Sequence, residues 1–119
     1  MKRILVIEDN EANLYLIRFI LEKHGLQVMF AKEGMTGVKH ALEEQPDLVI
    51  MDVQLPDING LEATKKIRQD EKGKDLKIVA LTSYAMTGDR EKALAAGCTG
   101  YMEKPIQPDK FMLEINKYL

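Results

Sequence analysis

With 119 residues, the chain has the length of one ordinary domain, and we expect residues 1–119 to fold as a single unit. Its 17 Lys and Arg residues against 19 Asp and Glu residues give a net charge of −2 without a basic cluster, which argues against direct binding to nucleic acid. No apolar run approaches the ~20 residues that cross a bilayer, and the lone cysteine, Cys98, cannot form an internal disulfide, so we expect a cytoplasmic protein with no membrane span.

The first half of the chain alternates short apolar runs with amphipathic segments. In chain order, the predicted elements are a strand at Ile4–Ile7, a helix at Glu11–Lys23, a strand at Leu26–Ala31, a helix through Val38–Leu42 and a strand at Leu48–Met51. Asn10 suits the N-cap of the first helix, and Gly25 suits the position just after its end. Pro46 stops the second helix, because the residue before a proline disfavours helical geometry.

The second half continues the alternation. In chain order, the predicted elements are a helix from an Asn59 cap to Gln69, a loop at Asp70–Asp75, a strand at Ile78–Leu81, a helix from a Thr87 cap to Ala96, a strand at Gly100–Met102 and a helix from Pro108 to Leu119. Asn59 and Glu62 resemble a capping box, and Pro108 suits a first helical position.

Five strands alternating with five helices predict an α/β fold built on an open, doubly wound parallel sheet. Several of the strands are apolar throughout, as strands covered on both faces must be. An eight-stranded barrel would need a much longer chain.

Polar side chains follow four of the five predicted strands, where ligands bind in such sheets. They are Glu8 and Asp9 after the first strand, Asp52 after the third, Thr82 and Ser83 after the fourth, and Lys104 after the fifth. Crowded carboxylates repel one another unless one is protonated or a cation lies among them, and oxygen ligands suit Mg²⁺. A carboxylate nucleophile, a metal ion, a hydroxyl and an ammonium group together predict a phosphoryl-transfer site.

Each of these residues alone has an ordinary structural explanation. An aspartate at a strand end usually caps a turn, and an exposed lysine is usually solvated. It is their joint placement after four different strands that favours a functional site.

At these residues the sequence resembles the receiver domains of bacterial two-component response regulators. The matching segments are ILVIEDNEAN (4–13), PDLVIMDVQLPDINGLE (46–62), IVALTSYA (78–85) and GCTGYMEKPI (97–106). Together they extend over the whole chain, and their combination in this order is specific. The resemblance implies a flavodoxin-like (βα)5 sheet with strand order 2-1-3-4-5.

The resemblance also implies a metal-dependent phosphoacceptor site. Asp52 matches the phosphorylated aspartate. Glu8 and Asp9 match the acidic pair that holds Mg²⁺ or Mn²⁺ with Asp52 and the backbone carbonyl of Gln54. Glu8 stands where an aspartate is more common, so its longer side chain is expected to reach the metal through water.

A conformational switch is implied in the same way. Thr82 matches the hydroxyl that moves toward the phosphoryl group, and Tyr101 matches the aromatic side chain that turns inward when it does. Lys104 matches the lysine that pairs with a phosphoryl oxygen, and the Lys104–Pro105 peptide bond is expected to be cis.

The implied donor is a histidine kinase or a histidine phosphotransfer protein, and the implied output face consists of the fourth helix, the fifth strand and the fifth helix. The sequence leaves open whether the chain works as a free-standing regulator or as the receiver of a longer hybrid kinase or transcription factor.

Three other functions are conceivable for such a chain. A haloacid-dehalogenase-like phosphatase needs a second aspartate two residues after the nucleophile, where this chain has Gln54. In a flavodoxin-like cofactor site, Glu8 and Asp9 would repel the phosphate. A degenerate receiver that works by protein contact alone remains the principal alternative, because intact site residues do not prove a working switch.

Overall fold

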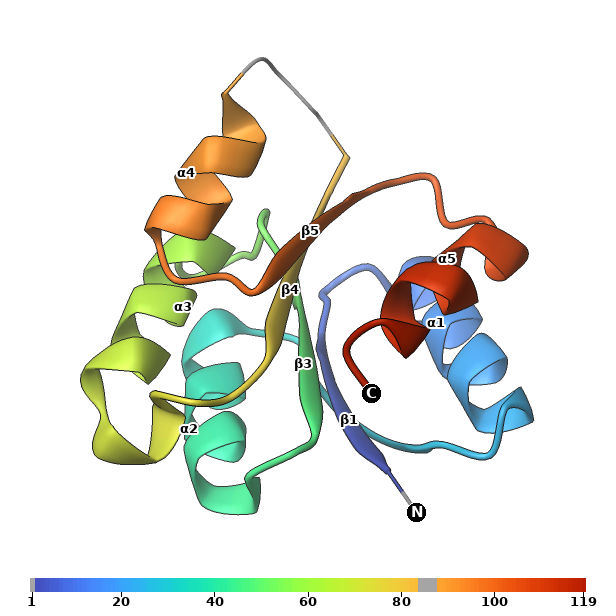
Figure 1. The fold of residues 1–119 in the computed structure, drawn as a ribbon, viewed down its shortest axis with the longest axis horizontal. Coiled ribbons are helices and arrows are strands. Elements are labelled where there is room, and N and C mark those ends of the chain that lie inside the picture. Colours follow the sequence, from blue (N-terminus) through green and yellow to red (C-terminus); the bar gives the residue numbers. More distant parts are fainter. Residues whose placement is uncertain (1, 84–87) are drawn as a thin grey trace.

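Five parallel strands form one sheet at the centre of the molecule (Figure 1). The computed structural model describes residues 2–83 and 88–119. The strands are β1 (Arg3–Ile7), β2 (Gln27–Ala31), β3 (Leu48–Asp52), β4 (Ile78–Thr82) and β5 (Gly100–Glu103). Their order is β2-β1-β3-β4-β5, and every neighbouring pair is parallel. The predicted doubly wound sheet and the 2-1-3-4-5 order are both confirmed.

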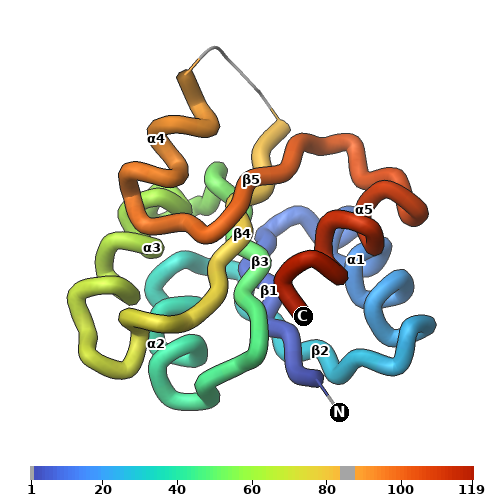
Figure 2. Tube along the Cα trace, viewed as in Figure 1, coloured from blue at the N-terminus to red at the C-terminus, as the bar shows by residue number. Residues whose placement is uncertain are grey.

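Helices cover both faces of this sheet. They are α1 (Glu11–Lys23), α2 (Gly34–Glu44), α3 (Gly60–Gln69), α4 (Asp89–Ala95) and α5 (Pro108–Asn116). The first and last lie side by side on one face, and the other three lie on the opposite face (Figures 1 and 2). None of the helices within residues 2–83 and 88–119 has the combination of length and apolar character that crossing a lipid bilayer requires.

The central strands are apolar on both sides because each side meets a helical layer. On β1, Ile4 and Val6 belong to the core shared with α1 and α5, whereas Leu5 and Ile7 belong to the core shared with α2, α3 and α4. All four side chains are fully buried. Successive residues of a strand point to opposite faces, so the continuous apolar run supplies both cores.

The capping residues act largely as the sequence predicts. The Asn10 side chain accepts a hydrogen bond from the Asn13 amide at 2.9 Å, and Gly25 has φ +80° just after α1 ends. Asn59 caps α3, but it accepts from the Leu61 amide at 2.7 Å rather than from the amide of the third helical residue, Glu62, which a capping box uses.

Element boundaries account for most of the differences from prediction. The expected loop at 70–75 contains a short 3-10 helix, η1 (Glu71–Gly73), because the Asp70 side chain caps it at the Lys72 amide. Helix α2 begins at Gly34, a start that the sequence did not locate, and α5 ends at Asn116 rather than at Leu119. Helix α4 begins after Gly88, and the predicted cap Thr87 lies outside the described residues.

Candidate functional site

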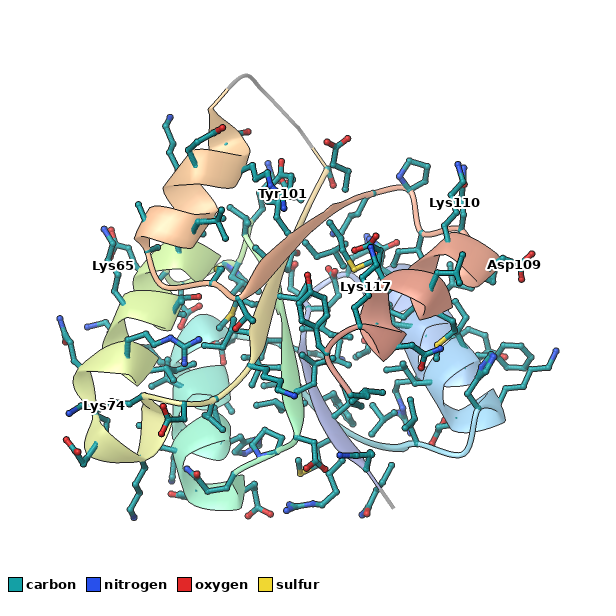
Figure 3. All side chains as sticks on the ribbon, viewed as in Figure 1. Lys65, Lys74, Tyr101, Asp109, Lys110 and Lys117 are labelled. Carbon is teal, nitrogen blue, oxygen red and sulfur yellow. The ribbon has the colours of Figure 1, made fainter. Side chains whose placement is uncertain are left out.

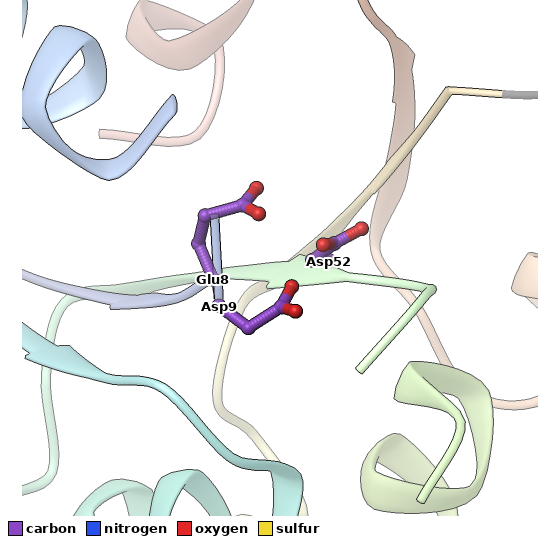
Figure 4. A group of neighbouring side chains, drawn as sticks. All are labelled: Glu8, Asp9 and Asp52. Carbon is purple, nitrogen blue, oxygen red and sulfur yellow. The ribbon is translucent and has the colours of Figure 1, made fainter. Parts of the chain in front are cut away.

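Three carboxylates meet at the carboxyl end of the sheet (Figure 4). Glu8 and Asp9 directly follow β1, and Asp52 is the last residue of β3. One oxygen from each lies within 4.8 Å of the others. Strands β1 and β3 are hydrogen-bonded neighbours, but the chain leaves them toward opposite faces, to α1 and α3. The cluster therefore occupies the point where the winding of the sheet reverses, the usual ligand position in such folds.

Lys104 joins this cluster from the end of β5. Its ammonium nitrogen lies 3.0 Å from Oε2 of Glu8 and 3.4 Å from Oδ2 of Asp52. Glu8 and Asp52 are 1% and 2% exposed, whereas Asp9 is exposed to solvent. The structure thus brings the predicted Glu8, Asp9, Asp52 and Lys104 together, with one ammonium group facing three carboxyl groups. The Lys104–Pro105 peptide bond is cis, as the resemblance implied.

Glu8 is a buried carboxyl group with a perturbed pKa. Its pKa is raised from an ordinary 4.5 to about 7, with burial as the main cause and the neighbouring Asp52 carboxylate contributing to the rise. The Lys104 ammonium acts in the opposite direction and only partly offsets burial. At neutral pH without metal, partial protonation of Glu8 therefore relieves some of the repulsion between the carboxylates. Protonation is one of the two outcomes expected for packed carboxylates.

This pKa predicts how stability depends on pH in metal-free protein. Between about pH 4.5 and 7, folded Glu8 holds a proton that the unfolded chain releases, so the free energy of unfolding should fall as pH rises through that window. We expect a change on the order of 1–3 kcal/mol, measured by urea unfolding in EDTA. Glu8→Gln should remove this part of the pH dependence, and an unchanged slope in the variant would contradict the assignment. Binding of Mg²⁺ should show the opposite trend and weaken below about pH 7, as the proton competes with the ion.

The donor set fits a hard divalent cation. All three ligand groups are carboxylates, and Oε2 of Glu8 is buried without a hydrogen bond from any described residue, although the Lys104 ammonium lies near it. Oxygen donors with excess negative charge suit Mg²⁺ or Mn²⁺. The loop after β3 begins beside the cluster, where the Gln54 amide donates to Oδ1 of Asp52 at 3.2 Å.

Thr82 and Tyr101 lie on neighbouring strands next to this cluster. Thr82 ends β4 and is 5% exposed, and its carbonyl accepts a hydrogen bond from the Lys104 amide at 2.7 Å. Tyr101 lies on β5, on the α4 side of the sheet (Figure 3). Both residues line a cavity of about 330 Å³, which Gln54 also borders. The Tyr101 hydroxyl is buried and has no hydrogen-bond partner among the described residues, and burial raises the pKa of this phenol.

Two features of the site were not predicted from the sequence. The closest partner of Lys104 is Glu8 rather than Asp52. The loop after β3 is also tied to α2 by the side chain of Asp57. A signal for this second contact exists in the sequence, because Glu33 precedes α2 where an Asp, Asn, Ser or Thr cap would be expected.

Comparison with known proteins agrees with this fold and cluster. The family model described as response regulator receiver domain matches residues 4–116. The chain therefore belongs to the response regulator receiver family. Among curated proteins it is similar to the polar-differentiation response regulator DivK of Brucella ovis, with 38% identity over 118 residues, which cover 99% of this chain and 96% of the relative.

Solved structures with this fold include receivers of different kinds. The receiver domain of the sensor histidine kinase PA1611 from Pseudomonas aeruginosa is 34% identical, with a TM-score of 0.90 over 98% of this chain and 96% of that one, and holds a magnesium ion in its active site cleft. The chemotaxis protein CheY4 of Vibrio cholerae is 25% identical, with a TM-score of 0.93 over 100% of this chain and 99% of that one.

Proposed function

We propose that this protein accepts a phosphoryl group on Asp52 from a phosphohistidine donor, with the help of Mg²⁺ or Mn²⁺, and signals the change to a partner protein. The observation that carries the proposal is the position of Asp52: its carboxylate is buried among two other carboxylates and lies 3.4 Å from a lysine ammonium. A purely structural role would not require so many like charges at one buried point.

The residues of the chain divide the chemistry between them. An Asp52 oxygen attacks phosphorus, the bond from phosphorus to the donor nitrogen breaks, and the electron pair of that bond leaves with the donor imidazole. Lys104, already directed at Asp52, then pairs with a phosphoryl oxygen. Glu8, Asp9, Asp52 and the backbone carbonyl of Gln54 would hold the cation. When bound, the cation neutralises charge on the phosphoryl oxygens.

The same site is proposed to drive a switch at Thr82 and Tyr101. A phosphoryl group adds about −1.5 to −2 charges, and the Thr82 hydroxyl at the end of the next strand is a group that can turn toward it. Because Thr82 and Tyr101 border one cavity, movement of the first changes the space open to the second. Phosphorylation then shifts an existing equilibrium between two arrangements.

Partners follow from this proposal. A cytoplasmic histidine kinase or histidine phosphotransfer protein would supply the phosphoryl group, and the face formed by α4, β5 and α5 would bind the output partner. The relatives include a response regulator and the receiver of a sensor kinase, so both contexts remain compatible with this domain. The alternative, a receiver that acts by contact alone, predicts no phosphorylation.

The deciding experiment is intact-mass analysis after incubation with acetyl phosphate, with Mg²⁺ or with EDTA. We expect one added phosphoryl group, seen only with metal, because the carboxylate cluster otherwise repels the incoming phosphate. Peptide mapping should place the group on Asp52. If neither acetyl phosphate nor a phosphorylated histidine donor labels the protein in Mg²⁺, the contact-only alternative replaces the proposal.

A further inference from the structure

The loop between β3 and α3 is fixed to a helix that takes no part in the carboxylate cluster. The Asp57 side chain accepts hydrogen bonds from two consecutive amides at the start of α2: Oδ1 from Gly34 at 2.7 Å and Oδ2 from Met35 at 2.8 Å. The bond from Met35, which has the larger effect, and the bond from Gly34 hold the pKa of Asp57 below its ordinary value. The Asp57 side chain therefore caps the start of a helix that lies 22–23 positions earlier in the chain.

Helix α2 depends on this distant cap because its own cap position supplies none. Glu33 occupies the N-cap position, and its side chain makes no capping hydrogen bond. A helix start leaves four amides without partners inside the helix, and a carboxylate there also interacts favourably with the helix dipole. The two amides that Asp57 satisfies belong to this set.

The neighbouring residue brings the loop and the helix into direct contact. A Cβ atom placed on Gly34 would meet Cγ1 of Ile58 at 2.6 Å, so Ile58 packs against the bare backbone of the helix start. Ile58 also packs against the core on this face of the sheet. The carboxylate contact and the apolar contact together give the middle of the loop a fixed position.

The two ends of the same loop are held at the functional site. The Gln54 amide donates to Oδ1 of Asp52, and the Gly60 amide donates to the Val53 carbonyl at 2.8 Å. Gly60 lies so close to the backbone of Asp52 that a Cβ atom would overlap its carbonyl. Among the described residues between these ends, Asp57 is the side chain that hydrogen-bonds to an element other than the flanking β3 and α3.

We propose that Asp57 is a positioning residue for the cation site: by clamping the loop to α2, it holds the backbone carbonyl of Gln54 where a divalent cation can use it. This inference rests on the proposed function for the role of Gln54, and it adds a residue that itself touches neither the cation nor the phosphoryl group. A side chain that orients a ligand from outside the coordination sphere typically changes metal affinity by 10–100-fold.

The test is the Mg²⁺ affinity of folded Asp57→Ala protein. The chain contains no tryptophan, so binding is followed by isothermal calorimetry and by amide chemical shifts. We expect a dissociation constant about tenfold higher than that of the wild type. Labelling by acetyl phosphate should then need about tenfold more Mg²⁺ for half-maximal rate, while the rate at saturating Mg²⁺ returns close to the wild-type value. Asp57→Asn keeps one of the two acceptor oxygens and should restore part of the affinity.

Two matched controls separate this role from simpler ones. Glu33→Gln removes an exposed negative charge at the same helix start without removing a capping bond, and should leave the affinity within about twofold. Asp70→Ala removes an aspartate cap from η1, away from the cluster, and should lower stability alone. Hydrogen exchange at the Gly34 and Met35 amides should accelerate in Asp57→Ala, which reports that the clamp has opened.

The outcomes are distinct. If folded Asp57→Ala binds Mg²⁺ as tightly as the wild type while those two amides exchange faster, Asp57 is only a helix cap and the positioning role is wrong. If Glu33→Gln also lost Mg²⁺ affinity by tenfold, the effect would be due to net charge, and the positioning role of Asp57 would again be wrong. Wild-type protein that binds Mg²⁺ but takes no phosphoryl group would contradict the proposed function. The Mg²⁺ affinities of the wild type and the variants would still decide whether Asp57 positions the cation site. Wild-type protein that binds no Mg²⁺ would overturn both.

Discussion

Asp52→Asn protein should take no phosphoryl group from acetyl phosphate or from a phosphohistidine donor. The amide that replaces the carboxylate is not a nucleophile under these conditions, so the loss should be complete within the detection of intact-mass analysis. The same substitution removes a negative charge that raises the pKa of Glu8. Metal-free Asp52→Asn protein should therefore be more stable than the wild type at pH 8, where the crowded charges repel most strongly.

The two readouts of this variant check each other. Loss of labelling alone could follow from misfolding, but a misfolded protein would not gain stability. Asp9→Asn is a matched control, since it removes an exposed carboxylate of the same cluster and leaves the proposed nucleophile in place. That variant should still be labelled, at a higher Mg²⁺ concentration. Labelling of Asp52→Asn at the wild-type rate would move the acceptor to another residue, with Glu8 the first to map.

The fold could be predicted because local and long-range preferences agree along most of this chain. Each central strand carries an apolar run of four residues, which suits a strand covered on both faces, and Asn10, Gly25 and Pro108 act at helix ends as their chemistry predicts. The grouping of Glu8 and Asp52 followed from topology, once the resemblance had supplied the strand order. Once the strands are parallel and neighbouring, their carboxyl ends must meet.

What the sequence could not give depends on contacts between distant residues. The cap on α2 comes from Asp57, and no local pattern around Glu33 names that partner. The pKa of Glu8 depends on how deeply it is buried and on the Lys104 ammonium reaching it from β5. The residue types show that carboxylates and a lysine are present, but only the three-dimensional structure shows which carboxylate the lysine approaches more closely.

Lys104 links the energetics of the resting site to its chemistry. In the metal-free protein its ammonium is the one described cation that forms an ion pair with the cluster, contacting both buried carboxylates. In the proposed reaction it must give up part of this pairing to meet the phosphoryl oxygens. Its contribution to stability and its contribution to phosphoryl transfer should therefore be lost together when it is replaced.

Lys104→Ala should slow labelling of Asp52 by roughly 10²–10³-fold at saturating Mg²⁺, the usual cost of removing one group that stabilises developing charge. Metal-free variant protein should also unfold more easily at pH 8, by about 3 kcal/mol, near the lower end of what breaking a buried ion pair costs, because the lysine is 11% exposed and Glu8 can take up a proton. Lys104→Met, which keeps most of the side-chain volume, should show the same loss of rate with less loss of packing.

Mg²⁺ offers a way to separate the two effects of this substitution. The cation replaces the missing positive charge, so the stability difference between wild type and Lys104→Met should shrink when Mg²⁺ is added, as urea unfolding would report. The labelling rate should not recover, because the cation does not replace the ammonium at the phosphoryl oxygen it contacts. A folded Lys104→Met protein labelled at the wild-type rate would show that Lys104 only balances resting charge and takes no part in phosphoryl transfer.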